Sequence, residues 1–239
     1  MEYTKLGNTD IRISKVCVGC MSFGKAGTMH DWTLDEASTA DVVKHALDLG
    51  INFFDTANGY SADTSEEYLG RALKNNVSRD KAVIASKVYF NPGRLSREAI
   101  NRELMPYSPL AAGHLTRPTW NADTLRSRTD RVAMGKYDRT EEQDMQIVSR
   151  VHDLAERYGV KMQEIALAWR WAKGVASPIV GATKSAYLDD AAAALSVKLS
   201  GDDIDYLEEP YLPHRIVGAI DHNPPDGVML LDEKKSDKT

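Results

Sequence analysis

Cysteine is scarce in this chain, whose 239 residues include only Cys17 and Cys20. Their Cys-Val-Gly-Cys spacing is compatible with a redox or metal site, but no second Cys or His pair follows at the spacing of zinc ligands. On a strand, side chains three positions apart point to opposite faces. We therefore predict two small buried side chains and no metal site.

Long apolar runs and an excess of positive charge are also absent. No run approaches the roughly 18 apolar residues of a membrane span, and residues 1–10 lack the apolar core of a signal peptide. The formal net charge of -5 offers no basic field to attract nucleic acid or an anionic membrane. We therefore expect a soluble, cytoplasmic protein that binds neither nucleic acid nor membrane.

Alternating strand and helix patterns are what the sequence does contain. Apolar strands at 13–20, 52–55 and 82–88 are separated by helical patterns at 33–49, with Thr33 as its cap, and 65–73. Helices are also predicted at 141–158, 161–173, 186–194 and 201–208, and one begins at 96–103, whereas 117–139 is predicted to be an exposed loop. Further strands are expected near Met105 and at 178–181. This alternation is typical of an α/β fold with a parallel sheet.

Three ionisable side chains stand at or just after predicted strand ends, where parallel α/β enzymes place their sites. Asp55 ends one strand, Tyr60 lies in the loop after it, and Lys87 ends the next strand. Each has an ordinary alternative: Asp55 can cap a turn, Tyr60 can be a loop aromatic, and Lys87 can be a solvated strand end. A cation beside a phenol would stabilise the phenolate, so together they predict an acid–base site.

Four segments resemble the aldo-keto reductase superfamily, and most closely its bacterial branch similar to potassium-channel β-subunits. They are 52–60 (NFFDTANGY), 65–73 (SEEYLGRAL), 85–88 (ASKV) and 107–113 (YSPLAAG). The resemblance implies a (β/α)8 barrel of the TIM type that reduces a small aldehyde or ketone with NADPH. It also implies that Tyr60 donates the proton, that Lys87 is the adjacent cation, and that Asp55 pairs with Lys87.

The same resemblance implies which residues hold NADPH. Tyr107 matches the aromatic residue that packs on the nicotinamide, and Asp190 keeps an acid near the adenine, whereas Tyr187 and Ala191 replace the Arg and Asn usual in that helix. A lysine and a hydroxyl at a strand-to-helix junction suit a phosphate group. The full implied cofactor set is Gly19, Cys20, Met21, Asp55, Tyr107, Ser108, Leu110, Gly113, Gly181, Thr183, Lys184 and Asp190.

About 100 residues of the family pattern are missing between Glu103 and Leu104, in a barrel class that usually needs about 250. The missing part would carry the fourth catalytic residue, a His, and His114 is interpreted as a loop residue instead. We count about five strands, near Val16, Phe53, Val83, Met105 and Ile179. The barrel is therefore predicted to be incomplete, and either marginally stable or paired with another copy in a homo-oligomer.

Two regions and three functional hypotheses follow. Residues 1–215 form the partial barrel domain, and 216–239, with Pro224-Pro225 and a charged end, form a mobile tail. The leading hypothesis is an NADPH-dependent carbonyl reductase. The alternatives are a catalytically inactive nucleotide-binding or regulatory protein, and a fragment without independent function. The substrate's identity is set by barrel-mouth loops that are partly missing.

Overall fold

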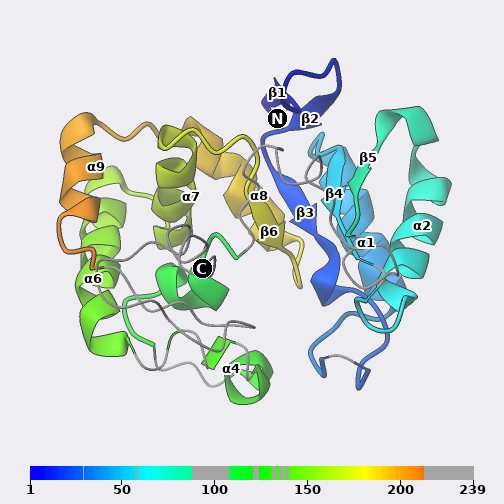
Figure 1. The fold of residues 1–239 in the computed structure, drawn as a ribbon, viewed down its shortest axis with the longest axis horizontal. Coiled ribbons are helices and arrows are strands. Elements are labelled where there is room, and N and C mark those ends of the chain that lie inside the picture. Colours follow the sequence, from blue (N-terminus) through cyan, green and yellow to red (C-terminus); the bar gives the residue numbers. More distant parts are fainter. Residues whose placement is uncertain are drawn as a thin grey trace, which may run out of the picture.

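A four-stranded parallel sheet lies at the centre of the molecule (Figure 1). The computed structural model describes residues 1–28, 30–57, 59–87, 108–120, 124–130, 133–134, 137 and 140–212. The sheet consists of β3 (Cys17–Gly19), β4 (Phe53–Asp55), β5 (Val83–Ala85) and β6 (Ile179–Gly181), in the order β5-β4-β3-β6. An antiparallel hairpin of β1 (Tyr3–Lys5) and β2 (Arg12–Ser14) precedes it.

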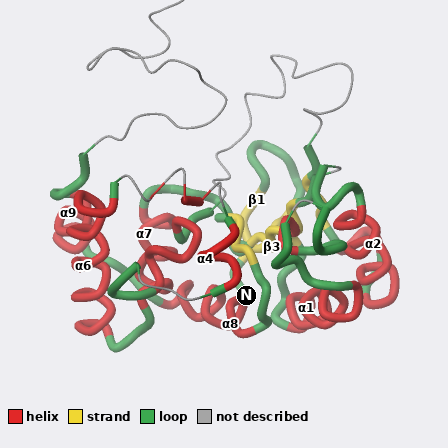
Figure 2. Tube along the Cα trace, turned by 90° about the horizontal axis from the view of Figure 1, so that it is seen from below, coloured by secondary structure: helices red, strands yellow, loops and turns green. Residues whose placement is uncertain are grey.

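Helices lie on two sides of the sheet (Figures 1 and 2). On one side, α1 (Glu36–Asp48) and α2 (Thr64–Asn76) follow β3 and β4 in the chain and pack against each other. The other side consists of α6 (Glu141–Tyr158), α7 (Met162–Ala172), α8 (Ala186–Ala193) and α9 (Gly201–Glu208), with the short α4 (Leu125–Thr129) below them in Figure 1. The 3₁₀ segments are Cys20–Ser22, Arg79–Lys81, Ala111–Thr116 and Ala194–Ser196.

The strand register aligns equivalent residues in rows across the sheet. On one face, Cys17, Phe53, Val83 and Ile179 stand side by side and form an apolar cluster with Ile13. On the other face, Val18, Phe54, Ile84 and Val180 belong to the main core beneath the helices. Alternation of side chains along a strand explains the two faces. The last row of the sheet consists of Gly19, Asp55, Ala85 and Gly181.

A second core lies between α6, α7 and α9. Its buried members include Val151 and Leu154 of α6, Ile165 of α7 and Leu207 of α9. The apolar positions of α6 recur at helical spacing, so one side of the helix is buried and the other carries charge. Gly159 ends α6 with φ +65°, a left-handed conformation that a glycine adopts without strain.

The predicted α/β class and the incomplete barrel are confirmed, since the described strands form an open sheet. The expected strand near Met105, the helix at 96–103 and the tail at 216–239 lie outside the described residues. The strand predicted over 13–20 is instead divided between β2 and β3, and Cys20 begins a 3₁₀ turn. No described helix is long and apolar enough to cross a membrane.

Two local predictions were wrong. The cap of α1 is Asp35, not Thr33, because the Asp35 carboxylate accepts a 2.8 Å hydrogen bond from the backbone N–H of Ser38. The segment 117–139 is not only an exposed loop: it contains α4, and Asp130 is buried. A helix of five residues is too short to show an apolar period in the sequence.

Candidate active site

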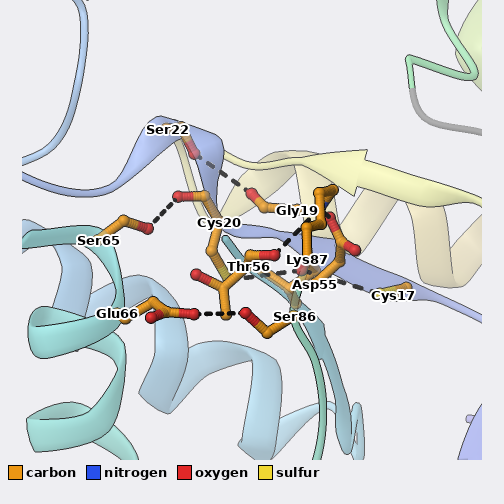
Figure 3. A network of polar contacts seen from close by, with 11 residues as sticks. Cys17, Gly19, Cys20, Ser22, Asp55, Thr56, Ser65, Glu66, Ser86 and Lys87 are labelled. Carbon is orange, nitrogen blue, oxygen red and sulfur yellow. Dashed lines mark hydrogen bonds and ion pairs between the residues drawn. The ribbon is translucent and has the colours of Figure 1, made fainter. Parts of the chain in front are cut away.

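Asp55 and Lys87 meet at the ends of two neighbouring strands. Asp55 is the last residue of β4, and its register partner Ala85 ends β5, two residues before Lys87. The Lys87 ammonium donates a 2.7 Å hydrogen bond to Oδ2 of Asp55 and a 3.0 Å bond to the carbonyl oxygen of Thr56 (Figure 3). Asp55 is almost fully buried, whereas 39% of the Lys87 side chain is exposed. The pair therefore has one buried partner and one that reaches solvent.

Tyr60 completes the group. The Lys87 nitrogen lies 4.9 Å from the centre of the Tyr60 ring. The loop that carries Tyr60 is held by its own backbone, because the Tyr60 N–H bonds to Ala57 and its carbonyl accepts from the N–H of Ser65 at the start of α2. The structure thus brings together the three residues that the sequence predicted to form an acid–base site.

Burial and neighbouring charges shift the pKa values of Asp55 and Lys87 for different reasons. Burial raises the pKa of Asp55, although Lys87 opposes that shift. Burial alone would lower the pKa of Lys87, but the neighbouring Asp55 and Tyr60 outweigh it and raise the pKa. The hydrogen bond from Lys87 to a buried carboxylate favours the charged ammonium, so we treat the contact as an ion pair at neutral pH.

Serine side chains tie the surrounding loops to α2 (Figure 3). Ser65 donates a 2.7 Å bond to the carbonyl oxygen of Cys20, and Ser86 donates a 2.6 Å bond to Glu66. The first bond fixes the loop after β3, and the second fixes the residue next to Lys87. The sequence analysis did not identify these supports, since no local pattern relates residues 20 to 45 positions apart.

Both cysteines are buried, as predicted. Cys17 packs in the apolar cluster on one face of the sheet, and Cys20 belongs to the main core on the other face. Burial, together with the nearby Asp55 carboxylate, raises the pKa of both thiols well above the ordinary value. Within the described part of the chain, no group of three or more His, Cys, Asp or Glu side chains could hold a metal ion.

The strand register places the first and last predicted cofactor segments next to each other. Gly19 pairs with Gly181, and Cys20 and Met21 continue from β3. Ser22 donates a 3.5 Å bond to the carbonyl oxygen of Ala182 and so links the two loops. Gly181 is exposed, and a Cβ atom there would meet nothing within 4 Å. This open backbone edge fits the close approach of an extended cofactor.

The segment Ser108–Gly113 has an unusual backbone. Ser108, Ala111, Ala112 and Gly113 all have positive φ, from 49° to 101°. The N–H of Ala112 bonds to the Ser108 hydroxyl at 3.0 Å, and Leu110 packs on the main core. Tyr107 lies outside the described residues. His114 was interpreted as a loop residue but lies in the 3₁₀ segment Ala111–Thr116, where its ring is tilted against those of Trp120 and Tyr137, with ring centres 4.1 and 5.0 Å away.

The predicted phosphate and adenine residues lie around the start of α8. Lys184 is exposed just before α8, and Thr183 is half-buried. Asp190 has structural partners in this chain: it accepts hydrogen bonds from Lys161, at the start of α7, and from Gln163 at 2.8 Å. These bonds tie α8 to α7. They could not be predicted, because nothing local in the sequence relates Asp190 to residues 27 and 29 positions earlier.

Comparison with known proteins shows which family the sequence matches. The model of the Aldo/keto reductase family matches residues 15–105 and 98–211. The versiconal hemiacetal acetate reductase of Aspergillus parasiticus is 27% identical over 339 positions, which cover 90% of this chain and 98% of that protein. A Schizosaccharomyces pombe protein named "Putative aryl-alcohol dehydrogenase" is 30% identical over 349 positions, covering 91% and 98%. At least 100 of the 339 positions have no counterpart among the 239 residues of this chain.

Solved structures support the fold. The glycerol dehydrogenase of Gluconobacter oxydans superposes with a TM-score of 0.65 at 17% identity, covering 91% of this chain and 98% of that one. A thermostable aldo-keto reductase in complex with the inhibitor epalrestat gives a TM-score of 0.61 at 17% identity, covering 88% and 100%. The sheet of this chain therefore corresponds to part of a (β/α)8 barrel.

Proposed function

Because this chain belongs to the aldo/keto reductase family, we propose that it reduces an aldehyde or ketone to an alcohol with NADPH, and that Tyr60 donates the proton to the carbonyl oxygen. One observation carries the proposal: Lys87 is held at 2.7 Å by Asp55 while its nitrogen lies 4.9 Å from the Tyr60 ring. The predicted acid therefore stands beside a fixed cation.

The chemistry follows from the charge of Lys87. A free tyrosine titrates near pH 10 and is a poor acid at neutral pH. A cation next to the phenol stabilises the phenolate that remains after proton transfer, and therefore promotes that transfer. Asp55 is a positioning residue in this scheme, because its buried carboxylate fixes the ammonium at the strand ends.

NADPH, when bound, supplies the hydride. The residues proposed to hold it lie on three segments: Gly19, Cys20 and Met21 after β3, beside Asp55; Tyr107, Ser108, Leu110 and Gly113; and Gly181, Thr183, Lys184 and Asp190 around β6 and α8. The adjacency of Gly19 and Gly181 and the open space at Gly181 support this placement. Lys184 and Thr183 would take the phosphate of the adenosine ribose, and Asp190 would have to exchange a present partner to contact the adenine.

A second candidate is a nucleotide-binding protein without turnover. The observation that favours it is length, since at least 100 positions of the alignment with the Aspergillus parasiticus reductase have no residue in this chain. The His that the family resemblance implies as the fourth catalytic residue would be among the lost positions. In this case NADPH would bind and no carbonyl would be reduced.

Measuring NADPH binding and carbonyl reduction separately distinguishes a reductase from a nucleotide-binding protein without turnover. NADPH binding is measured by fluorescence, and turnover by loss of absorbance at 340 nm with a small aromatic aldehyde. We expect saturable binding and slow turnover, with Tyr60→Phe abolishing turnover while binding is retained. Tyr211→Phe is the matched control, because Tyr211 is 59% exposed. Binding without turnover favours the second candidate, and unchanged turnover in Tyr60→Phe would refute the role of Tyr60.

The open sheet also motivates a proposal on assembly. The four strands of the described parallel sheet leave a barrel unclosed, so we propose that two copies of the chain associate. Size-exclusion chromatography with light scattering tests this directly. A stable monomer that unfolds in one cooperative transition would contradict it.

A further inference from the structure

The chain directly after Tyr60 has a backbone conformation that ordinary residues rarely adopt. Ser61, Ala62 and Asp63 have positive φ angles of 50°, 50° and 68°, and none of them is a glycine. In this left-handed region the Cβ atom crowds the following carbonyl oxygen, so each residue adds strain to the backbone. We call these three residues the 61–63 turn. Strain of this kind persists only where the surrounding structure holds the segment in place.

The loop after β3 holds the 61–63 turn through two side-chain hydroxyl groups. Ser61 is fully buried, and its hydroxyl donates a 3.1 Å hydrogen bond to the carbonyl oxygen of Phe23. The Thr64 hydroxyl donates a 2.6 Å bond to the carbonyl oxygen of Ser61. It also accepts a 2.9 Å bond from the backbone N–H of Lys25. The turn is therefore joined to the loop after β3 at two points.

Gly24 allows the two segments to approach this closely. A Cβ atom at Gly24 would lie 2.5 Å from Cβ of Ser61 and 2.7 Å from Oγ1 of Thr64. Packed interiors have no room for such contacts, so one of the segments would have to move. The φ angle of Gly24 is +111°, which also favours glycine. Close packing thus adds to the two hydrogen bonds in holding the turn.

The 61–63 turn connects Tyr60 to the start of α2. The Tyr60 carbonyl oxygen accepts a 3.4 Å bond from the backbone N–H of Ser65, across the turn. The conformation of the turn therefore decides the direction in which the chain leaves Tyr60. It thereby sets where the phenol ring lies relative to Lys87, whose nitrogen is 4.9 Å from the ring centre. A turn that relaxed to negative φ would change that direction and move the ring.

We propose that Ser61 is a positioning residue for Tyr60: its buried hydroxyl holds a strained turn that keeps the phenol beside the Lys87 ammonium. The inference rests on the proposed proton donation by Tyr60. Ser61 itself would touch neither substrate nor cofactor, because its side chain is fully buried and bonded to Phe23.

Two substitutions at position 61 separate this role from ordinary packing. Alanine removes the hydroxyl and keeps the strain, so the turn should relax and Tyr60 should move. Glycine removes the hydroxyl and the strain together, because it adopts positive φ freely, so the turn no longer needs to be held. A side chain that only filled space would show the reverse order, since glycine leaves the larger void.

Hydrogen–deuterium exchange and steady-state kinetics measure the turn and its effect on Tyr60. Exchange is followed by mass spectrometry on the full chain at the amides of Thr64 and Ser65, which bond to the carbonyl oxygens of Ser61 and Tyr60. Ser61→Ala should speed this exchange about tenfold or more, because local opening becomes easier. It should lower kcat by about tenfold or more, because displacement of a catalytic group is costly, and leave NADPH affinity within about twofold. Ser61→Gly should recover most of both losses.

Glycines of the loop after β3 supply a matched pair of further variants. Gly24→Ala should reproduce the effects of Ser61→Ala, because the new Cβ would push the turn away. Gly27→Ala is the control: Gly27 also has positive φ, but a Cβ there would meet nothing within 4 Å. If Ser61→Ala fails to fold, Thr64→Val removes the second joint and Thr64→Ser retains it, and the same contrast is expected between these two variants.

Three results would overturn the proposal: exchange in Ser61→Ala at the wild-type rate, an unchanged kcat in that variant, or equal impairment of Ser61→Gly and Ser61→Ala. A wild type without turnover would refute the reductase function itself. The exchange pattern would then still decide whether Ser61 holds the turn, because it requires no activity.

Discussion

Gly19 lies so close to Ile179 that a Cβ atom at position 19 would be 2.9 Å from Cγ2 of Ile179. The backbone of Gly19 is ordinary extended structure, with φ -81°. The glycine is therefore required by the approach of β3 to β6 and not by its own conformation. The same two strands, β3 and β6, lead into the loops that are proposed to hold the cofactor.

Substitution of Gly19 tests that approach. Gly19→Ala should lower the free energy of unfolding by about 1–3 kcal/mol, because overpacking in a buried sheet forces neighbours to shift. Gly181→Ala is the control in the paired position, where a Cβ would meet nothing within 4 Å, and it should change stability by less than about 0.5 kcal/mol. Urea denaturation of the three proteins measures both values. Equal stability of the two variants would contradict the close packing of β3 on β6.

Asp55→Asn should affect turnover more than stability. Burial raises the pKa of Asp55, so its charge is already disfavoured by folding. We expect a change of less than about 1 kcal/mol in unfolding free energy, and a fall in kcat of about 100-fold, the size of a typical acid–base effect. NADPH-dependent reduction and urea denaturation are the measurements. Asp10→Asn is the control, because Asp10 is exposed and pairs with the exposed Lys5 at the surface.

The raised pKa of Asp55 also predicts how the stability difference between the wild type and Asp55→Asn changes with pH. A carboxyl whose pKa is raised by folding stabilises the protein below its unfolded pKa of about 3.9, and that contribution is lost as pH rises through the folded pKa. The wild type should therefore lose stability relative to Asp55→Asn as the pH rises from about 3 towards neutrality. A difference between the two proteins that does not depend on pH would contradict the raised pKa.

The parts of the site that the sequence predicted are those carried by local segments. Asp55 and Lys87 follow recognisable strands, and parallel strands bring their ends together. The pairing of β3 with β6 joins residues about 160 positions apart, so no local pattern could supply it. The α1 cap was misassigned because Thr33 and Asp35 are both acceptable cap residues, and only the bond to Ser38 decides between them.

The buried thiols should be unreactive in the native protein. Burial raises the pKa of Cys17 and Cys20, so little thiolate is present at pH 8. A thiol reagent such as DTNB should modify neither residue rapidly in buffer, and both in concentrated urea. Cys20→Ser provides the control that assigns any single reactive thiol. Fast modification of two thiols in buffer would show that the sheet opens on both faces.

The final prediction concerns Asp203, which holds the start of α9. Its carboxylate accepts bonds from the backbone N–H and hydroxyl of Ser200 at 2.9 and 2.7 Å, and from the hydroxyl of Tyr158, and it pairs with Arg157. Burial alone would raise the pKa of Asp203, but these bonds outweigh it and lower the pKa. Asp203→Asn should therefore cost about 1–2 kcal/mol of unfolding free energy at pH 7, the range of a lost helix cap.

The pKa of Asp203 is lowered, so its contribution to stability changes with pH in the opposite direction to that of Asp55. A depressed pKa contributes stability above the unfolded value of about 3.9, and that contribution is lost as pH falls through the folded pKa. The difference between wild type and Asp203→Asn should thus be full at pH 6–7 and shrink in acid below about pH 4, as measured by urea denaturation. Asp202→Asn is the matched control, because the adjacent Asp202 is exposed and lies outside the capping box. An equal loss in Asp202→Asn would mean that charge at the helix start, and not the buried network, stabilises α9.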